Sequence, residues 1–397
     1  MSHSKFLYIL RFSLAGEALK DLSLSSDEAK EILSLAEAHK ILPLIYDCIH
    51  SCLSEEFSSL HQKVKYTVAL QTLRTEAFKA LYTALRESGN TPVVVKGILC
   101  RNLYPKPDLR ISADEDLLIP KQDFTKFKDA LNALGFTQKD ESCESYQTAF
   151  VRADGFYVEL HTTLFDTTDY FSKWNVFFKQ PSSENIWEDT DGLKLLTLSP
   201  TDHLLYLILH ALKHFIHSGV GIRQVCDILL FIRKHKTSID FDYIFTKCKE
   251  AGALKFAAGL LAVCKNHLCS NTLSFDIPMP DINVDETALL KDILHAGVYG
   301  GSTGARRHSG SVTFAAAKNG KKQRLIRRVF PKAESLDRRY SYAKRNTALL
   351  PLAWGHRLIN YRKETKNSEN NSPKEALSIG NNRLLLLEEY GLINDKK

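Results

Sequence analysis

The spacing of apolar residues is helical over the first part of the chain and becomes strand-like beyond it. Ser25 and Glu28 form the capping-box pattern that precedes a helix over 29–38, and residues 64–88 form one long helical repeat. This pattern predicts an all-helical region over residues 1–90.

A series of short strands follows, with one helix among them. Residues 93–95 are three consecutive valines, which is typical of a buried strand. Asp154-Gly155 is a strong hairpin signal between two alternating runs. The pattern predicts strands over 93–95, 117–119, 147–152 and 156–160, a helix over 123–134, and a short strand or extended arm over 193–198.

Helical spacing returns after Ser199. Ser199-Pro200-Thr201-Asp202 contains the cap, the proline and the acid of a helix start, and a second helix is predicted over 222–233. Arg223 and Asp227 are one turn apart in that second helix, so we expect them to pair. The predicted divisions are a helical region (1–90), a core (91–170), a helical domain (171–300), a basic C-terminal region (301–362) and a polar linker with a terminal helix (363–397).

Asp114 and Asp116 lie one residue apart, at the start of the apolar run that continues to Ile119. Successive side chains of a strand point to opposite faces, so the two carboxylates share a face and Glu115 points to the other. Two carboxylates on one face repel unless a cation lies between them, and such pairs suit Mg²⁺ together with phosphate oxygens of a substrate. A solvated acidic turn is the alternative. The charge of Glu115 indicates that its face is partly exposed.

Lys96-Gly97 follows the valine strand and precedes a helical stretch. Gly97 allows the backbone to approach a phosphate, the free N–H groups of the next helix favour an anion, and Lys96 adds a positive charge. The alternative is that glycine serves the strand-to-helix turn alone.

Glu159 and His161 share one face of the predicted strand that ends the hairpin. Glu159 is therefore our candidate for a third carboxylate, and His161 is a candidate to orient it or to contact substrate. In the alternative interpretation, both are polar residues of an edge strand.

Four histidines recur on one face of the helix that starts after Ser199: His203, His210, His214 and His217. The zinc-protease pattern requires glutamate directly after the first histidine of an i, i+4 pair, and Ala211 stands there instead. This excludes that class of enzyme. A structural or acceptor-binding role is favoured over a metal site.

Together these motifs make the chain similar to the uncharacterised nucleotidyltransferase family of the polymerase-beta-like superfamily. The similarity spans residues 91–361. It is carried by Lys96-Gly97, Leu103-Tyr104-Pro105, Pro107, Arg110, Asp114, Asp116-Leu117-Leu118-Ile119-Pro120, Ala130-Leu131, Leu134-Gly135-Phe136, Glu159-Leu160-His161, residues 210–215, Arg223, Asp227-Ile228, and residues 328–331 and 349–354.

The resemblance implies an α+β fold, with a small mixed-sheet nucleotidyltransferase core and flanking helical domains. It also implies a Mg²⁺-dependent enzyme that moves a nucleoside monophosphate, with AMP from ATP favoured, from a nucleoside triphosphate to an unknown acceptor. The expected catalytic and metal-ligating residues are Asp114, Asp116 and Glu159. The expected nucleotide-binding residues are Lys96, Gly97, Arg110 and His161.

Two departures from the superfamily pattern define an alternative. Ile98 stands where a small hydroxyl residue usually follows the glycine, and Glu115 stands where an apolar residue usually separates the two acids. A catalytically silent protein that still binds a nucleotide is therefore the first rival hypothesis.

Composition narrows the class further. The chain is 44% hydrophobic and 25% charged, which is ordinary for a globular protein. No apolar run approaches the roughly 20 residues that span a bilayer, and Arg11 interrupts the N-terminal apolar stretch too early for a signal peptide. The eight cysteines include no Cys-x-x-Cys pair. We expect a cytoplasmic protein with reduced cysteines and no membrane partner.

Positive charge is concentrated near the C-terminus. The net charge is +7, and residues 305–345 carry thirteen Lys or Arg against two acids, so this segment is +11 and the remainder is −4. Such a segment attracts phosphates or nucleic acid, so an enzyme that modifies nucleic-acid ends is the second rival hypothesis. Arg327 and Arg328 are its candidate triphosphate or acceptor contacts. The alternative is a solvated helix face beside a mobile glycine-rich loop over 297–310, with a disordered stretch over 363–374.

Overall fold

The structure of the protein is a computed structural model. It describes residues 2–139, 146–168, 170–178, 184–217, 219–269, 273–297, 313, 333, 336, 340–365 and 373–393. The chain divides into two compact units, one of residues 1–213 and 221–290 and the other of residues 214–220 and 291–397. Arg327, Arg328 and most of the stretches 297–310 and 363–374 lie outside the described residues, so the predictions made for them stay predictions.

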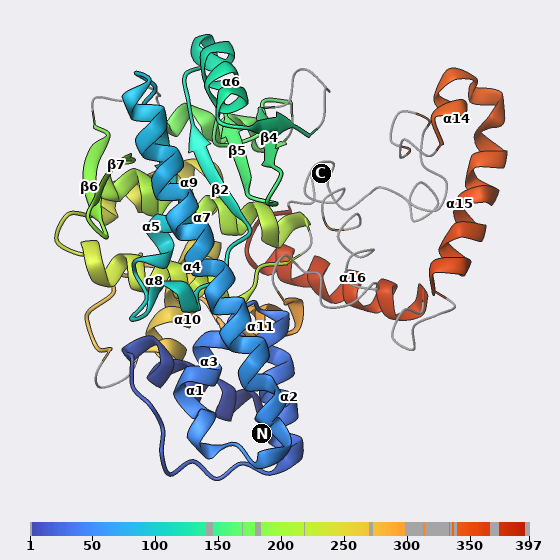
Figure 1. The fold of residues 1–397 in the computed structure, drawn as a ribbon. Coiled ribbons are helices and arrows are strands. Elements are labelled where there is room, and N and C mark those ends of the chain that lie inside the picture. The colour runs from blue at the N-terminus through green and yellow to red at the C-terminus, as the bar shows by residue number, and fades with distance from the viewer. Residues whose placement is uncertain are drawn as a thin grey trace. The chain divides into compact units, whose positions relative to one another are not determined.

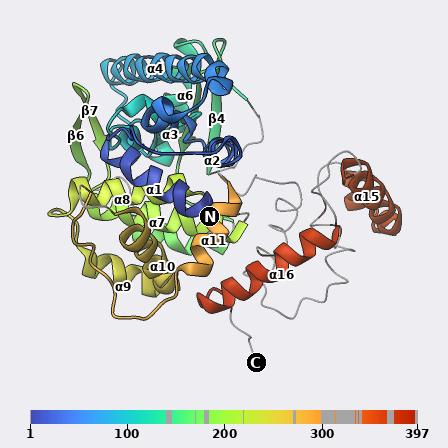
Figure 2. The same ribbon diagram turned by 90° about the horizontal axis from the view of Figure 1, so that it is seen from below.

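The predicted N-terminal helices are present. They are α1 (Ser2–Ala15), α2 (Ser26–Ala38), α3 (Leu42–Ile49), the short 3₁₀ turns η1 (His50–Cys52) and η2 (Glu55–Phe57), and the long α4 (Ser58–Glu87). The capping box is confirmed, because the Glu28 N–H donates to the Ser25 hydroxyl and the Ser25 N–H donates to the Glu28 carboxylate. Helices α1, α2 and α3 pack together (Figure 2).

A mixed sheet follows α4. Within the described residues its strands are β1 (Val93–Val95), β2 (Asp114–Leu118), β3 (Phe136–Gln138), β4 (Gln147–Arg152), β5 (Tyr157–His161), β6 (Ile186–Thr190) and β7 (Leu193–Thr197). Their order is β3-β4-β5-β2-β1-β7-β6. β2 pairs with β5 and β1 with β7 in parallel, and the other neighbours are antiparallel. The expected α+β class is confirmed.

The apolar core lies on one face of this sheet. Helix α4 and helix α6 (Phe124–Ala133) cover that face, as Figure 1 shows. Phe78 and Leu85 of α4 pack with Leu117 of β2 and with Val158 and Leu160 of β5. Because side chains alternate along a strand, the residues between these apolar positions point to the opposite face. Asp114, Asp116 and Glu159 therefore lie on the face away from α4.

Connecting elements and further helices complete the described structure. They are α5 (Gly97–Arg101), η3 (Pro107–Leu109), η4 (Lys121–Asp123), η5 (Tyr170–Phe177), α7 (Pro200–His217), α8 (Ile222–His235), α9 (Phe241–Ala251), α10 (Leu254–Val263), the π-helical turn η6 (Cys264–Leu268), α11 (Thr287–Ala296), α14 (Ser341–Arg345), η10 (Thr347–Leu349), α15 (Leu350–Thr365) and α16 (Pro373–Glu389). The Ser199 hydroxyl accepts from the Asp202 N–H at 3.2 Å, which confirms the predicted start of α7.

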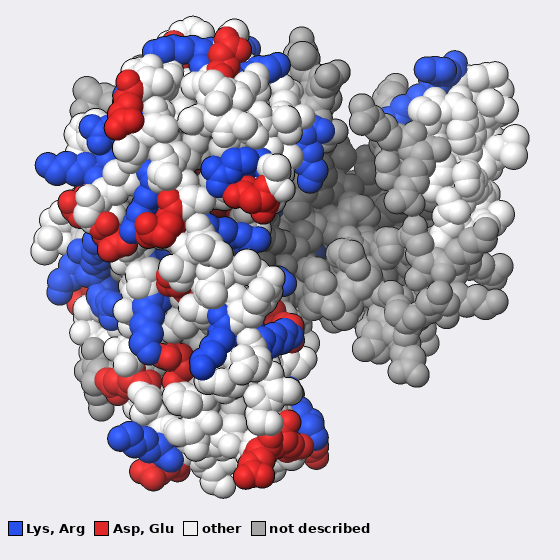
Figure 3. Space-filling model, in the orientation of Figure 1, with Lys and Arg blue, Asp and Glu red and all other residues white. Residues whose placement is uncertain are grey.

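Two observations concern the expected absence of a membrane partner and the hypothesis of nucleic-acid binding. None of the helices in the described part of the chain combines the length and apolar character that crossing a membrane requires. On the face drawn in Figure 3, the described acidic and basic side chains are interspersed. The described residues of that face therefore form no broad area of one charge.

Candidate active site

The register of β2 against β5 brings the acidic residues together. Asp116 lies directly beside Glu159 in the parallel pair, and Val95, the last residue of β1, lies beside Asp116 on its other side. Asp114, Asp116, Glu159 and His161 therefore share one face, which we call the carboxylate face. Lys96 directly follows Val95 in the chain, so its backbone lies close to Asp116.

Asp116 is the centre of the site. One of its oxygens lies 3.0 Å from His161 Nε2, and the other lies 3.0 Å from Lys96 Nζ. The Glu159 carboxylate lies 3.4 Å from the same His161 nitrogen and accepts a 2.9 Å hydrogen bond from Gln147. One ligand atom each from Asp116, Glu159 and His161 lies within 4.8 Å of the others.

The donor set of this face fits a divalent cation. Two carboxylates with an imidazole offer hard oxygen ligands and one nitrogen ligand within a small volume. Oxygen ligands suit Mg²⁺, whereas imidazole suits softer ions, so Asp116 and Glu159 are the better magnesium ligands. Asp114 lies outside the group of three but on the same face.

The ionisation of these groups reflects their crowding. Burial disfavours the charged form of Asp116, but Lys96 and then His161 outweigh burial and hold the pKa of Asp116 well below its usual range. Burial likewise opposes protonation of His161, yet Asp116 and Glu159 raise its pKa. Burial and then the neighbouring Asp116 raise the pKa of Asp114. Positive charge on this face is therefore favourable. Lys96 supplies it, and the raised pKa of His161 favours its protonated form.

Lys96 is held in a strained turn. Its backbone has φ 58° and ψ −127°, and Gly97 has φ 41°. A non-glycine residue in such a region costs on the order of 1–3 kcal/mol. This turn positions the Lys96 ammonium between Asp116 and His210 Nε2, which is 3.3 Å away. The strain thus accompanies a lysine directed at the carboxylate face.

Glu115 is buried, so the expectation that it is partly exposed is wrong. Its side chain pairs with Arg101 at 2.6 Å, where the two side chains are 4% and 0% exposed, and it accepts a 3.0 Å hydrogen bond from the Ile98 N–H. The error arose because a strand pattern reveals which face a residue occupies, but not whether a cationic side chain such as Arg101 pairs with it on that face. Glu115 therefore belongs to the core of the fold.

Glu115 also explains the glycine of the turn. A Cβ added to Gly97 would lie 2.0 Å from a Glu115 oxygen, which is far inside contact distance. The same carboxylate accepts a hydrogen bond from the N–H of Ile98, the second residue of α5. Gly97 is thus required by an internal carboxylate, and the approach of a phosphate to this turn stays a prediction.

Helix α7 places a basic side chain, Lys213, against Tyr146, which directly precedes β4. Lys213 donates a 2.8 Å hydrogen bond to the Tyr146 hydroxyl, and the Tyr146 ring lies 6.0 Å from the His161 ring. His210 and Lys213 are three residues apart and so share a side of the helix. This three-residue spacing from His210 could have identified Lys213 as a candidate site residue. No sequence pattern indicated Tyr146, which lies just before β4.

Arg110 lies in a different environment from the one expected for a nucleotide-binding residue. Its guanidinium donates two 2.7 Å hydrogen bonds to the carboxylate of Asp227, and the Tyr104 hydroxyl donates to the same carboxylate at 2.8 Å. All three groups are buried. The expected pairing of Asp227 within its own helix is replaced by this contact, while the Arg223 side chain donates to the Ile111 carbonyl.

His203 supports the Lys96 turn from within the protein. The Lys96 N–H donates to His203 Nε2 at 3.4 Å, so this nitrogen must carry a lone pair. Burial, followed by the charges of His235 and Lys96, lowers the pKa of His203 to about 3. The imidazole is therefore neutral in the folded protein.

His203 is expected to make the protein less stable in mild acid. An unfolded histidine, with a pKa of about 6.5, binds the proton more tightly than this folded one, so the stabilisation is present above that pH and is lost as pH falls. The loss from this group is roughly 2 kcal/mol between about pH 6.5 and 5. Chemical denaturation across this range should show a steeper decline for the wild type than for His203→Gln.

The comparison with His203→Gln isolates this histidine. Burial raises the pKa of the neighbouring Asp202 to about 6, and Asp202 therefore stabilises the fold toward acid pH, in the opposite sense. That contribution is common to both proteins and cancels in their difference. Glutamine can still accept from the Lys96 N–H, so the turn keeps its hydrogen bond. Parallel stability curves would contradict the assignment.

Comparisons with known proteins identify the family of the chain. A sequence model of one family, described as uncharacterised nucleotidyltransferase, matches residues 25–268, which is more than half of the chain. The match includes all seven described strands, the carboxylate face and Lys213. No curated protein and no solved structure matches the chain. The matched range starts earlier and ends earlier than the range of residues over which motifs were recognised.

Proposed function

The chain belongs to the uncharacterised nucleotidyltransferase family, and from that premise we propose that it transfers AMP from ATP to an acceptor at the carboxylate face. Nucleotidyl transfer itself follows from the family, and the chain is a transferase enzyme. The observation that carries the finer proposal is the convergence of Asp116 and Glu159 on adjacent parallel strands, with Asp114 on the same face.

The chain's own residues would bind and orient the triphosphate. Lys96 contacts the Asp116 carboxylate, His210 lies beside Lys96, and Lys213 contacts Tyr146, whose ring lies beside His161. A bound triphosphate would draw the Lys96 ammonium away from Asp116, because phosphate oxygens compete for it. His161 would keep its hydrogen bond to Asp116 and so hold that carboxylate in one orientation. These groups position the α-phosphorus and need no covalent intermediate.

A divalent cation fits the carboxylates. Asp114, Asp116 and Glu159 would hold Mg²⁺, which when bound neutralises the triphosphate and lowers the pKa of an acceptor hydroxyl. In this interpretation Lys96 and His161 are the positive charges that stabilise the carboxylates when no nucleotide is bound. The pKa shifts of Asp116 and His161 support this, since each group stabilises the charge of the other.

The proposal is tested in two steps on the full-length protein. Calorimetry with each nucleoside triphosphate and Mg²⁺ measures binding and base preference. Release of pyrophosphate, and transfer of label from α-labelled ATP to components of a cell lysate, then measure chemistry. We expect Mg²⁺-dependent labelling that EDTA abolishes. Tight binding without release in the presence of many acceptors would favour the silent nucleotide-binding protein, and absence of binding would contradict both hypotheses.

Lys213→Gln is expected to weaken ATP binding about tenfold, because a charge-assisted hydrogen bond contributes roughly 1.5–3 kcal/mol. The matched control is Lys247→Gln, which removes another lysine that lies over aromatic rings, those of Phe177 and Tyr243. Calorimetric titration of both variants makes the comparison. Equal ATP affinity in the two variants would remove Lys213 from the proposed triphosphate site.

A further inference from the structure

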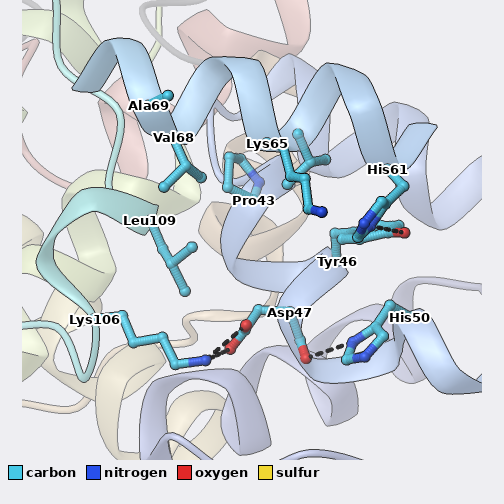
Figure 4. Close-up of a pocket in the computed structure, with 11 residues that line it drawn as sticks. Pro43, Tyr46, Asp47, His50, His61, Lys65, Val68, Ala69, Lys106 and Leu109 are labelled. Carbon is cyan, nitrogen blue, oxygen red and sulfur yellow. Dashed lines mark hydrogen bonds and ion pairs between the residues drawn. The ribbon is translucent and has the colours of Figure 1, made fainter. Parts of the chain in front are cut away.

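A pocket of about 510 Å³ lies among α3, α4 and the segment that contains η3. This volume is within the range of sites that bind small organic molecules. Figure 4 shows its lining: residues of α4 extend toward α3, and Lys106 and Leu109 come from the η3 segment. Its lining residues include none of the residues of the carboxylate face. All belong to the first compact unit.

The floor of the pocket is apolar. Pro43, Val64 and Leu109 are buried, and Val68 and Ala69 of α4 line the same space. An apolar floor of this kind favours a ring or a short hydrocarbon body, because water gains freedom when such a surface is covered. The floor therefore selects for an apolar part of the ligand.

The walls of the pocket are held in place by hydrogen bonds between the elements that form it. The Asp108 carboxylate, next to Leu109, accepts hydrogen bonds from Thr72 at 2.6 Å and Thr75 at 3.0 Å, both on α4. The Tyr46 hydroxyl on α3 contacts His61 Nδ1 on α4 at 3.2 Å. These contacts tie the η3 segment and α3 to α4, so the pocket exists before any ligand enters it.

The rim of the pocket is basic. Lys65, Lys106, His50 and His61 line it, and Asp47 is its single acid. Lys106 Nζ lies 2.7 and 2.8 Å from the two oxygens of Asp47, so that pair neutralises itself. Lys65 has no ion-pair partner among the residues that the structure describes. A positive charge thus stands beside an apolar floor.

We propose that this pocket binds a small organic anion whose body is one or two apolar rings. The ring body would lie against Val64, Val68 and Leu109, and its carboxylate, phosphate or sulfonate would pair with Lys65. The imidazoles of His50 and His61 lie near the same rim and offer further polar contacts. The pocket shares no lining residue with the carboxylate face, so this proposal does not depend on the proposed nucleotide transfer.

The first test measures charge selectivity with a fluorescent probe, anilinonaphthalene sulfonate, on the full-length protein. We expect one saturable site, from which naphthoate and naphthyl phosphate displace the probe. The neutral naphthylmethanol and the cationic naphthylmethylammonium should need at least about tenfold higher concentrations, since one charge-assisted contact is lost. Equal displacement by the anion and the cation would overturn the proposal.

The second test locates the site. Ala69→Trp should fill the pocket and weaken probe binding at least about tenfold, whereas Ala80→Trp, at an exposed position of the same helix, should not. Lys65→Gln should weaken anion binding, and Lys63→Gln, two residues away and outside the lining, should not. Probe binding that survives Ala69→Trp would place the probe elsewhere and overturn the proposal. A concentration-dependent dimer that Ala69→Trp abolishes would also overturn it, because a second copy of the chain would then cover the pocket.

Discussion

Asp116→Asn is expected to lower the rate constant of the nucleotidyl-transfer step by at least about 10³-fold, because the loss of several kcal/mol of charge stabilisation translates into a factor of ten for each 1.4 kcal/mol. Asparagine keeps the shape of the side chain and can still accept from His161. It removes the charge that faces Lys96 and that would hold the cation. The defect should therefore lie in chemistry, with the fold intact.

The measurement is single-turnover pyrophosphate release at saturating ATP, together with circular dichroism of both proteins. Asp154→Asn is the matched control, since this exposed carboxylate pairs with Arg152 at the hairpin between β4 and β5. It should leave the rate unchanged. Robust transfer by Asp116→Asn would falsify the proposed mechanism and leave the family assignment standing.

Sequence alone sufficed for features that depend on near neighbours. The capping box at Ser25, the hairpin at Asp154-Gly155 and the start of α7 at Ser199 each rest on residues a few positions apart, and each was found. The shared face of Asp114 and Asp116 follows from strand alternation in the same way. These predictions needed no knowledge of what the rest of the chain contacts.

The pairing of strands lies beyond such local patterns. That Asp116 lies beside Glu159 depends on the register of two strands separated by a helix and a hairpin. A one-residue shift in that register would move Glu159 to the opposite face. The contact between Tyr146 and Lys213, which are 67 residues apart, depends on the path of α7 across the sheet. Distant packing decides both, so the sequence offered candidates but no geometry.

The partners of buried charges could not be predicted from the sequence, and the expected exposure of Glu115 was wrong for this reason. Glu115 was expected near solvent because an isolated charge in the core is costly, yet Arg101 and the Ile98 N–H compensate it. Arg110 was grouped with nucleotide contacts because its position matches the family pattern. The structure pairs it with Asp227, 117 residues away, and its contact with a nucleotide stays a prediction. A sequence gives the charges but not their partners. A charged residue within a motif that resembles a catalytic one can therefore stabilise the fold, as Glu115 does through Arg101.

Asp227→Asn is expected to lower the free energy of unfolding by about 3–5 kcal/mol, the largest stability effect foreseen for this chain, because it leaves the buried Arg110 charge without its carboxylate. Both hydrogen bonds of that pair are 2.7 Å long, and both side chains are at most 6% exposed. Urea denaturation of the wild type and the variant gives the difference directly.

The same substitution on the surface supplies the control. Arg152 also donates from two guanidinium nitrogens to one carboxylate, that of Asp154, but this pair is more exposed, so Asp154→Asn should cost less than about 1 kcal/mol. At a temperature where Asp227→Asn remains folded, its affinity for ATP should match that of the wild type if Arg110 serves the fold alone. A stability loss equal to that of the control would show that the buried pair contributes little, and a selective loss of ATP affinity would return Arg110 to the nucleotide site.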